Sequence, residues 1–363
     1  MFQRIAITLL ALTGTLDALK TAIESPGGMF LVELHCEFAE QQCQKFEKSI
    51  ELVNQFFENA FKVKQRISVQ VQVGGSQDAK GPDADMLATT ISSYSIPQLK
   101  VPNQYYHNAL LKQTKGARFD SFDFTVYFNG NSKFYFPEDF ATLQNAPSII
   151  DVLAHEFLHG MGFNVDFENK ILNADFAPRY ETESGLDKKP DTITFQSNSF
   201  MQHIYTEDGI KMTKLIDEMN KEPSVIIKGD KVQLSDYHLE KFEQFKKYAA
   251  APKRFYFKTS TGDHIYLDTN PPFVPGASLS HIDDMYNDGE EALMTKAEPK
   301  HTGVHDVDFK GWKTSPFGPK TLRIMETLGY TLNPKPHRKK SLLGFKDNML
   351  DCKKKGLSQC AQM

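Results

Sequence analysis

The chain has 363 residues, of which 40% are hydrophobic and 12% aromatic, and its formal net charge at pH 7 is -4. A chain of this length and composition can bury a large core in one or two domains. The small negative charge gives no broad basic field to hold a nucleic-acid backbone, so we expect no nucleic-acid partner.

The first twenty residues have the pattern of an export signal. Arg4 gives a positive start, an apolar run follows from Ile5 to Leu12, and small residues that suit cleavage lie between Thr13 and Ala18. We therefore expect residues 1–20 to be a signal peptide and the protein to be secreted. A buried N-terminal helix and a membrane anchor are the alternatives. The apolar run is far shorter than the roughly 20 residues that cross a bilayer, and no later run is longer, so we predict no transmembrane segment.

The four cysteines fall into two close pairs. Local disulfides, Cys36 with Cys43 and Cys352 with Cys360, are the simplest interpretation for a secreted chain. Four cysteines allow three connectivities, and the spacing does not choose among them. A thiolate of Cys36 that caps a latent zinc centre is a further alternative.

The first part of the chain predicts a helix between two strands. Residues 29–34 form an apolar run typical of a strand, and residues 46–60 carry apolar side chains at helical spacing. Residues 67–73 alternate strictly between apolar and polar side chains, which predicts a strand with one buried face.

The next segment predicts a loop, a short helix and a hairpin. Residues 74–85 are rich in Gly, Asp and Pro and indicate a loop, and residues 105–112 favour a helix. Residues 122–128 alternate as a strand, and the turn at Asn129 to Asn131 predicts a hairpin with residues 133–136.

A capped helix then carries a cluster of chemically active side chains. Ser148 is placed as the N-cap, Asp151 follows three residues later, and we expect the helix to end between Gly160 and Gly162. His155 and His159 are four residues apart, so their imidazoles leave one face of the helix with about 5 to 6 Å between the Cβ atoms. Two nitrogen ligands at about 2.0 to 2.1 Å from one Zn²⁺ can converge from such a pair.

Glu156 supplies the remaining group that peptide hydrolysis needs. Zinc polarises a carbonyl and lowers the pKa of water, while a carboxylate takes the proton and passes it to the leaving amine. The pattern His155-Glu156-Phe157-Leu158-His159 therefore predicts a zinc peptidase with Glu156 as general base. The alternative is a surface helix in which the pattern arose by chance.

A catalytic zinc ion normally takes three protein ligands and a water, so a third ligand must come from elsewhere. In the compact metzincin arrangement a glycine three residues after the second histidine is followed, three residues later, by the third histidine. Gly162 is present, but Val165 occupies the second position. His281 is the best candidate. Ligand chemistry alone also allows Asp166, Asp175, Glu181, Glu183, His301 and His305.

Three short segments carry a resemblance to a known family. The segment from His155 to Phe163, then Ser-His-Ile-Asp at 280–283 and Leu-Met-Thr at 293–295, resemble the leishmanolysin-type branch of the metzincins and similar secreted microbial and fungal peptidases. The resemblance spans roughly residues 29–332. It implies an α+β zincin fold, metzincin-like, with a mixed sheet, an active-site helix and a long insertion before the third zinc ligand.

The same resemblance implies roles for individual residues. His155, His159 and His281 would bind Zn²⁺, Glu156 would be the general base, and Met294 would form a methionine turn beneath the metal. The substrate would be a polypeptide.

Three regions of the chain follow from these assignments. Residues 21–333 form the expected metallopeptidase domain, residues 164–277 are its insertion, and residues 334–363 form a basic C-terminal tail. Within the insertion the pattern predicts helices at residues 208–220 and 237–250 and a pair of strands between residues 254 and 267. Nothing in the sequence predicts the oligomeric state, the substrate preference or the role of the insertion.

Two further residues and one alternative function complete the expectations. Asp283 could orient a zinc-binding histidine, and Tyr286 could donate to the oxyanion. The expected function is that of a secreted zinc-dependent metalloendopeptidase. The alternative is a non-catalytic, zinc-stabilised secreted binding protein on the same fold, which has no need for a carboxylate at Glu156.

Overall fold

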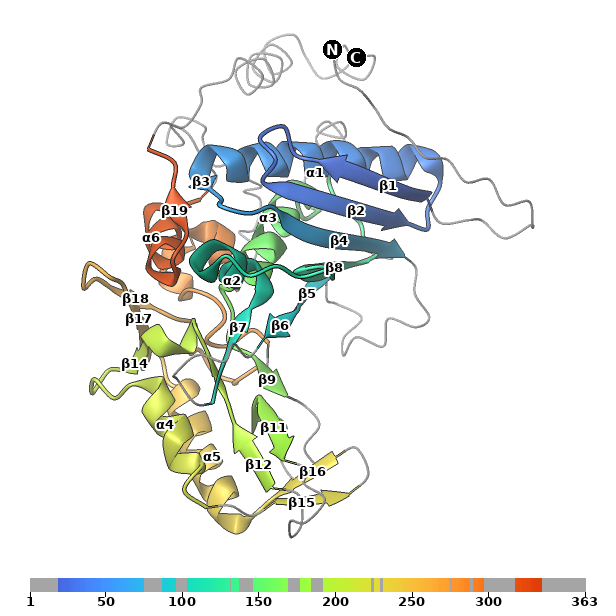
Figure 1. The fold of residues 1–363 in the computed structure, drawn as a ribbon. Helices are drawn as coiled ribbons and strands as arrows, with labels where there is room; N and C mark the ends of the chain where they lie inside the picture. Colours follow the sequence, from blue (N-terminus) through green and yellow to red (C-terminus); the bar gives the residue numbers. More distant parts are fainter. Residues whose placement is uncertain are drawn as a thin grey trace.

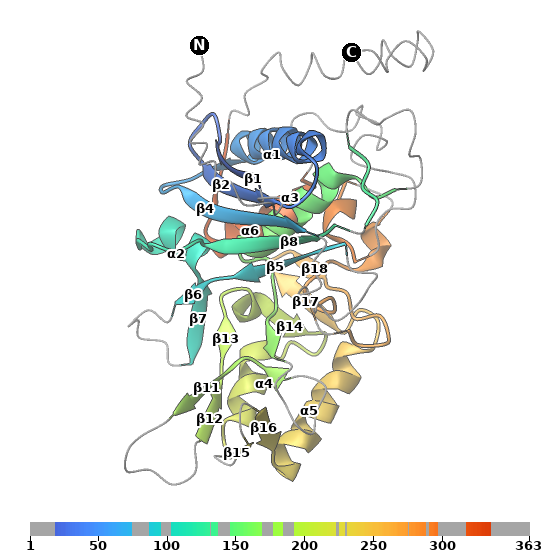
Figure 2. The same cartoon turned by 90° about the vertical axis from the view of Figure 1, so that its right-hand side faces the viewer.

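The computed structural model describes residues 19–74, 87–95, 103–130, 132–136, 146–168, 177–183, 192–222, 225–228, 231–274, 276–287, 290–296 and 317–334. Two regions are visible in Figure 1. The upper region, here the sheet lobe, holds the large sheet and its helices. The lower region, here the insertion lobe, is built mainly from the residues between 164 and 277. Figure 2 shows the same two regions after a quarter turn.

A five-stranded mixed sheet forms the centre of the sheet lobe. Its strands are β1 (Leu19–Glu24), β2 (Phe30–Cys36), β4 (Ile67–Gly74), β8 (Phe124–Asn129) and β5 (Ala88–Ser92), in that spatial order. β2, β4 and β8 are parallel, and the edge strands β1 and β5 run antiparallel to their neighbours. The expected mixed sheet and α+β class are therefore confirmed.

Two helices cover one face of this sheet. They are α1 (Glu40–Ala60), which contacts β1 and β2, and α3 (Ile149–Gly160), which contacts β5 and β8. The strict alternation in β4 buries its four β-branched side chains and leaves the polar ones half-buried, as the sequence predicts. The apolar positions of α1 are buried at the predicted spacing.

Aromatic side chains join the sheet to both helices. The ring of Phe157 in α3 contacts the rings of Phe30 in β2, Phe57 in α1 and Phe124 in β8, with centroids 5.3 to 5.8 Å apart. All four side chains are fully buried, and each contributes about 1.5 to 3 kcal/mol relative to an exposed one. This cluster fixes α3 against the sheet.

The expected disulfide between Cys36 and Cys43 is present and links the end of β2 to α1. The second expected pair, Cys352 with Cys360, lies outside the described residues. None of the helices within the described residues is both long and apolar enough to span a membrane.

Three expectations for the sheet lobe were wrong or incomplete. The hairpin at residues 122–136 does not form, because β4 and β5 already occupy both edges of β8, and Tyr135 makes only an isolated bridge with Ser148. The helix expected at 105–112 starts later, as α2 (Asn108–Lys115), after the strand β7 (Gln104–His107). Neither edge strand, β1 or β5, was predicted.

The insertion lobe contains the elements that the sequence predicts. Its helices are α4 (Met212–Met219) and α5 (Asp236–Ala249), and β17 (Phe255–Lys258) pairs with β18 (His264–Tyr266). The Ser235 side chain caps α5 by accepting a hydrogen bond from the His238 amide.

Short elements complete the described fold. The insertion lobe and its approaches hold β6 (Tyr94–Ser95), β9 (Phe167–Glu168), β10 (Ala177–Pro178), β11 (Tyr180–Glu183), β12 (Thr192–Phe195), β13 (Ser197–Asn198), η2 (Met201–His203), β14 (Ile204–Thr206), β15 (Val225–Lys228) and β16 (Lys231–Leu234). The remaining elements are β3 (Phe61–Lys62), η3 (Asp284–Tyr286), η4 (Ala292–Met294), α6 (Pro319–Leu328) and β19 (Thr331–Leu332).

Candidate metal centre and active site

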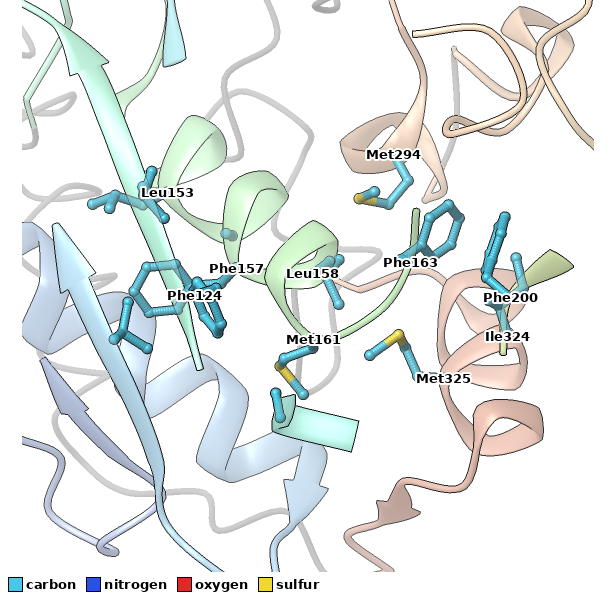
Figure 3. Close-up of a cluster of buried hydrophobic side chains, with 14 of the residues drawn as sticks. Phe124, Leu153, Phe157, Leu158, Met161, Phe163, Phe200, Met294, Ile324 and Met325 are labelled. Atoms are coloured by element: carbon cyan, nitrogen blue, oxygen red, sulfur yellow. The ribbon is translucent and has the colours of Figure 1, made fainter. Parts of the chain in front are cut away.

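Helix α3 carries the first part of the site. Its N-terminus is capped as predicted, because the Ser148 hydroxyl accepts a hydrogen bond from the Asp151 amide at 3.4 Å. Near its other end Gly160 packs directly on β8, and an added Cβ there would overlap three atoms of the Phe124 ring. Figure 3 shows Phe124, Leu153 and Phe157 gathered between the strand and the helix. The close approach fixes the helix turn that carries the histidines.

Three imidazoles meet beside this packed helix, and those of His159 and His281 are buried. The Nε2 atom of His155 lies 2.9 Å from Nε2 of His159 and 3.0 Å from Nε2 of His281. His281 is 126 residues beyond His155 in the sequence. The structure therefore brings the third predicted ligand to the helical pair.

Each imidazole is oriented by a backbone carbonyl. The Nδ1 atoms of His155, His159 and His281 lie 2.6, 2.7 and 2.8 Å from the carbonyl oxygens of Leu293, Phe163 and Ala277 respectively. A carbonyl can only accept a hydrogen bond, so each Nδ1 must carry the proton. In the neutral ring the Nε2 atom then has a free lone pair.

Three lone pairs that face one another at this distance repel unless a cation lies between them. Tetrahedral zinc with bonds of about 2.0 to 2.1 Å places its nitrogen ligands about 3.3 Å apart, close to the separations found here. Among the described residues, these three histidines form the one group of His, Cys and carboxylate side chains whose ligand atoms are close enough for a metal. Three neutral imidazole nitrogens are a donor set that fits a zinc ion.

The protonation states agree with this geometry. Burial and the neighbouring His155 lower the pKa of His281 to about 3. Burial, followed by the charges of His155 and His281, also holds the pKa of His159 well below its usual value. Both rings are therefore neutral at physiological pH and able to bind a metal through Nε2.

The segment around His281 is held by short backbone pairings. The His281 carbonyl accepts a hydrogen bond from the Asp268 amide, and the Ile282 amide donates to the Met294 carbonyl. Met294 lies in η4 and is fully buried. Figure 3 shows it in the same buried cluster as Leu158 of α3. The turn that contains Met294 thus supports the site, and the carbonyl of its neighbour Leu293 orients His155.

Glu156 lies beside the imidazoles and is 7% exposed. Its carboxylate oxygen Oε2 accepts a hydrogen bond from the Thr90 hydroxyl at 2.6 Å, and the same hydroxyl is 3.0 Å from the Glu156 carbonyl oxygen. Burial raises the pKa of Glu156, against the opposing effects of His155 and of the Thr90 hydrogen bond. The edge strand β5 therefore positions the only carboxylate that the sequence places between the two helical histidines.

Comparison with known families identifies the wider group. A family model described as SPBPB7E8-like matches residues 14–185 and 180–347. The protein belongs to the SPBPB7E8-like family. No curated protein and no solved structure matches the chain. The two matched segments of the SPBPB7E8-like family model include the helical pair with Glu156 and the distant His281.

In this SPBPB7E8-like protein Asp166, a rival third ligand, has other partners. Its carboxylate accepts hydrogen bonds from the hydroxyls of Tyr94 and Tyr105 and from the side-chain amides of Asn164 and Asn198, at 2.7 to 3.1 Å. Four donors satisfy both oxygens, so Asp166 joins the sheet lobe to the insertion lobe and does not take part in the metal centre.

Of the other rivals, only Glu181 has a described side chain, and it is not among the grouped metal-binding side chains. Glu181 is exposed in β11. Asp175, His301, His305 and the side chain of Glu183 lie outside the described residues.

Contrary to expectation, Asp283 does not orient any of the three histidines. Its side chain accepts a hydrogen bond from the Met285 amide and caps η3, while backbone carbonyls orient all three imidazoles. The ammonium group of Lys320 lies over the Tyr286 ring, 5.0 Å from the centroid of that ring. Its predicted contact with an oxyanion stays a prediction.

Sequence reasoning missed two side chains that support the candidate site of this SPBPB7E8-like protein. Thr90 holds Glu156, and the Ser280 hydroxyl binds the backbone of Val165. An alternating pattern at residues 88–92 was the one available signal for Thr90, and it is weak because Ile91 points outward and is exposed. Ser280 was part of the Ser-His-Ile-Asp segment but had no assigned role.

Proposed function

We propose that the protein is a secreted zinc-dependent metalloendopeptidase on a metzincin-like zincin fold. The observation that carries the proposal is the convergence of three Nε2 lone pairs beside a buried carboxylate. This combination provides a metal site with an open position and an adjacent proton acceptor, which are the two requirements for hydrolysis of an amide by activated water.

Each side chain has a distinct task in this proposal. His155, His159 and His281 would hold the ion through Nε2. A bound zinc ion supplies polarisation of the substrate carbonyl and lowers the pKa of water. Glu156 takes the proton from the attacking water and delivers it to the leaving amine. Its raised pKa suits this role, because a proton acceptor works best when its pKa lies near the working pH.

Secretion is supported by two features. The disulfide between Cys36 and Cys43 is typical of proteins that fold in an oxidising compartment. Leu19 and Lys20, the last two residues of the expected signal peptide 1–20, lie in strand β1, so cleavage would have to follow Ala18 to leave the whole strand in the sheet. Residues 1–18 lie outside the described residues.

The decisive experiment compares Glu156→Gln with the wild-type chain. We expect the wild type to contain one zinc ion per chain by elemental analysis and to cleave a quenched-fluorescent peptide library. Glu156→Gln keeps the zinc ligands but loses the proton acceptor, so cleavage should fall by about 100-fold or more while zinc content stays unchanged. Glu181→Gln, at an exposed position in β11, is the matched control and should behave as the wild type.

A second variant tests the distant ligand. His281→Ala should lower zinc occupancy strongly, whereas His264→Ala, at an exposed position in β18, should not.

Full cleavage by Glu156→Gln would exclude the general-base role. A wild-type chain that binds zinc but cleaves no member of the library would favour the alternative, a zinc-stabilised secreted binding protein.

A further inference from the structure

Ser280 makes an unusual double contact with the segment that leaves α3. It directly precedes His281 and is fully buried. Its hydroxyl accepts a hydrogen bond from the Val165 amide at 3.1 Å and donates one to the Val165 carbonyl at 3.2 Å. One side chain therefore satisfies both polar groups of a backbone unit that lies 115 residues earlier in the chain.

The position of Val165 gives this contact its significance. Val165 occupies the place at which the compact metzincin pattern has its third histidine. Two residues before it, the Phe163 carbonyl accepts the hydrogen bond that orients His159. The Ser280 hydroxyl thus attaches the segment that carries His281 to the segment that orients His159.

The backbone around Ser280 is shaped for this contact. Leu279 adopts a left-handed conformation with φ of 67°, which is rare for a branched residue, and its amide donates to the Asp268 carbonyl at 2.8 Å. Leu279 is also fully buried. Such a conformation persists only where the surroundings enforce it, and it occurs here between Ser278 and Ser280, two residues before His281.

We infer that Ser280 is the positioning residue of the metal centre: its hydroxyl fixes His281 against the end of α3, so that a ligand remote in sequence replaces the one absent at position 165. This inference rests on the proposed function in that the three imidazoles hold zinc. Groups that support metal ligands without binding the metal typically change metal affinity by about 10- to 100-fold when they are removed.

The matched pair of variants is Ser280→Ala and Ser278→Ala. Both serines are fully buried in the same turn; Ser280→Ala loses two hydroxyl hydrogen bonds and Ser278→Ala loses one. The Ser278 hydroxyl, however, accepts from the Val274 amide at 3.0 Å and, among the described residues, makes no hydrogen bond with the α3 segment. The two changes are therefore similar in size and burial and differ in the connection to Val165.

The experiment measures Zn²⁺ affinity by chelator competition and the visible absorption spectrum of the Co²⁺-substituted protein. Ser280→Ala should raise the Zn²⁺ dissociation constant by about 10- to 100-fold and alter the Co²⁺ spectrum. Ser278→Ala should leave both the Zn²⁺ dissociation constant and the Co²⁺ spectrum as in the wild type. Ser280→Thr retains the hydroxyl and should bind Zn²⁺ more tightly than Ser280→Ala, which keeps the test decisive if the alanine variant folds poorly.

The outcomes separate this inference from the proposed function. Equal effects of the two alanine variants, or wild-type affinity and spectrum in Ser280→Ala, would overturn the positioning role while leaving the metal centre intact. Binding by Ser280→Thr as weak as by Ser280→Ala would also overturn it. A wild-type chain that binds neither Zn²⁺ nor Co²⁺ would overturn the metal centre itself.

Discussion

Removal of the hydroxyl that holds Glu156 should reduce catalysis without loss of zinc. Thr90→Val keeps the branched shape that suits a strand but deletes the donor 2.6 Å from the Glu156 carboxylate. A hydrogen bond to a charged group contributes about 1.5 to 3 kcal/mol. If that energy serves to orient the proton acceptor, its loss corresponds to a decrease of about 10- to 100-fold in kcat/KM, at about 1.4 kcal/mol per tenfold change.

The neighbouring residue provides the control for this prediction. Thr89 lies on the same strand, and because successive side chains alternate, it points to the opposite face of the sheet. Thr89→Val should therefore retain wild-type kcat/KM. The assay is cleavage of a fluorogenic peptide, with zinc content measured on the same samples. A kcat/KM for Thr90→Val within twofold of that for Thr89→Val would refute the argument that β5 positions the carboxylate.

Two further predictions concern stability. Gly160→Ala should lower the free energy of unfolding by about 1 to 3 kcal/mol in urea titrations, because the added Cβ overlaps the Phe124 ring and the ring or the helix must shift by about 1 Å. Burial lowers the pKa of His238 in the folded chain. Below about pH 6.5 this histidine therefore binds more protons in the unfolded chain than in the folded chain, and the free energy of unfolding falls as the pH drops. Urea unfolding of His238→Gln at pH values near 7.5 and 5.5 should show a smaller decrease than the wild type, and an equal decrease would contradict the assignment.

Local sequence periodicity predicted the elements that bury one face. The alternation in β4 and the helical spacing in α1 each specify a buried side, and the structure has both as predicted. The cap at Ser148 likewise placed the start of α3 correctly. These signals are carried by residues close together in the chain, so they can be read without knowledge of the tertiary fold.

The elements that depend on a partner could not be predicted in this way. Strand β5 is short and only partly alternating, and pairing with β8 rather than its own pattern makes it a strand. The same pairing defeats the predicted hairpin, since it occupies the edge of β8 that a returning strand would need. Tertiary pairing thus outweighed a correct local turn signal.

The residues of the candidate site also differ in whether a local sequence pattern could predict them. Residues His155, Glu156 and His159 follow from a five-residue pattern, whereas His281 followed from its resemblance to a family motif. The carbonyls that fix the three tautomers left no signal, because every residue has a backbone carbonyl whatever its side chain. Asp166 illustrates the converse, since its proximity in sequence suggested a ligand but four donors satisfy it.

The tie between Val165 and Ser280 has a consequence for how the family can vary. Val165 and Ser280 are 115 residues apart in the sequence and are joined by hydrogen bonds, so the two ends of the stretch between them are held together. The entropy cost of such a closed excursion grows only slowly, by about 0.6 kcal/mol for each doubling of its length. The length and surface of this stretch can therefore change at little cost in free energy, while the three histidines stay in place.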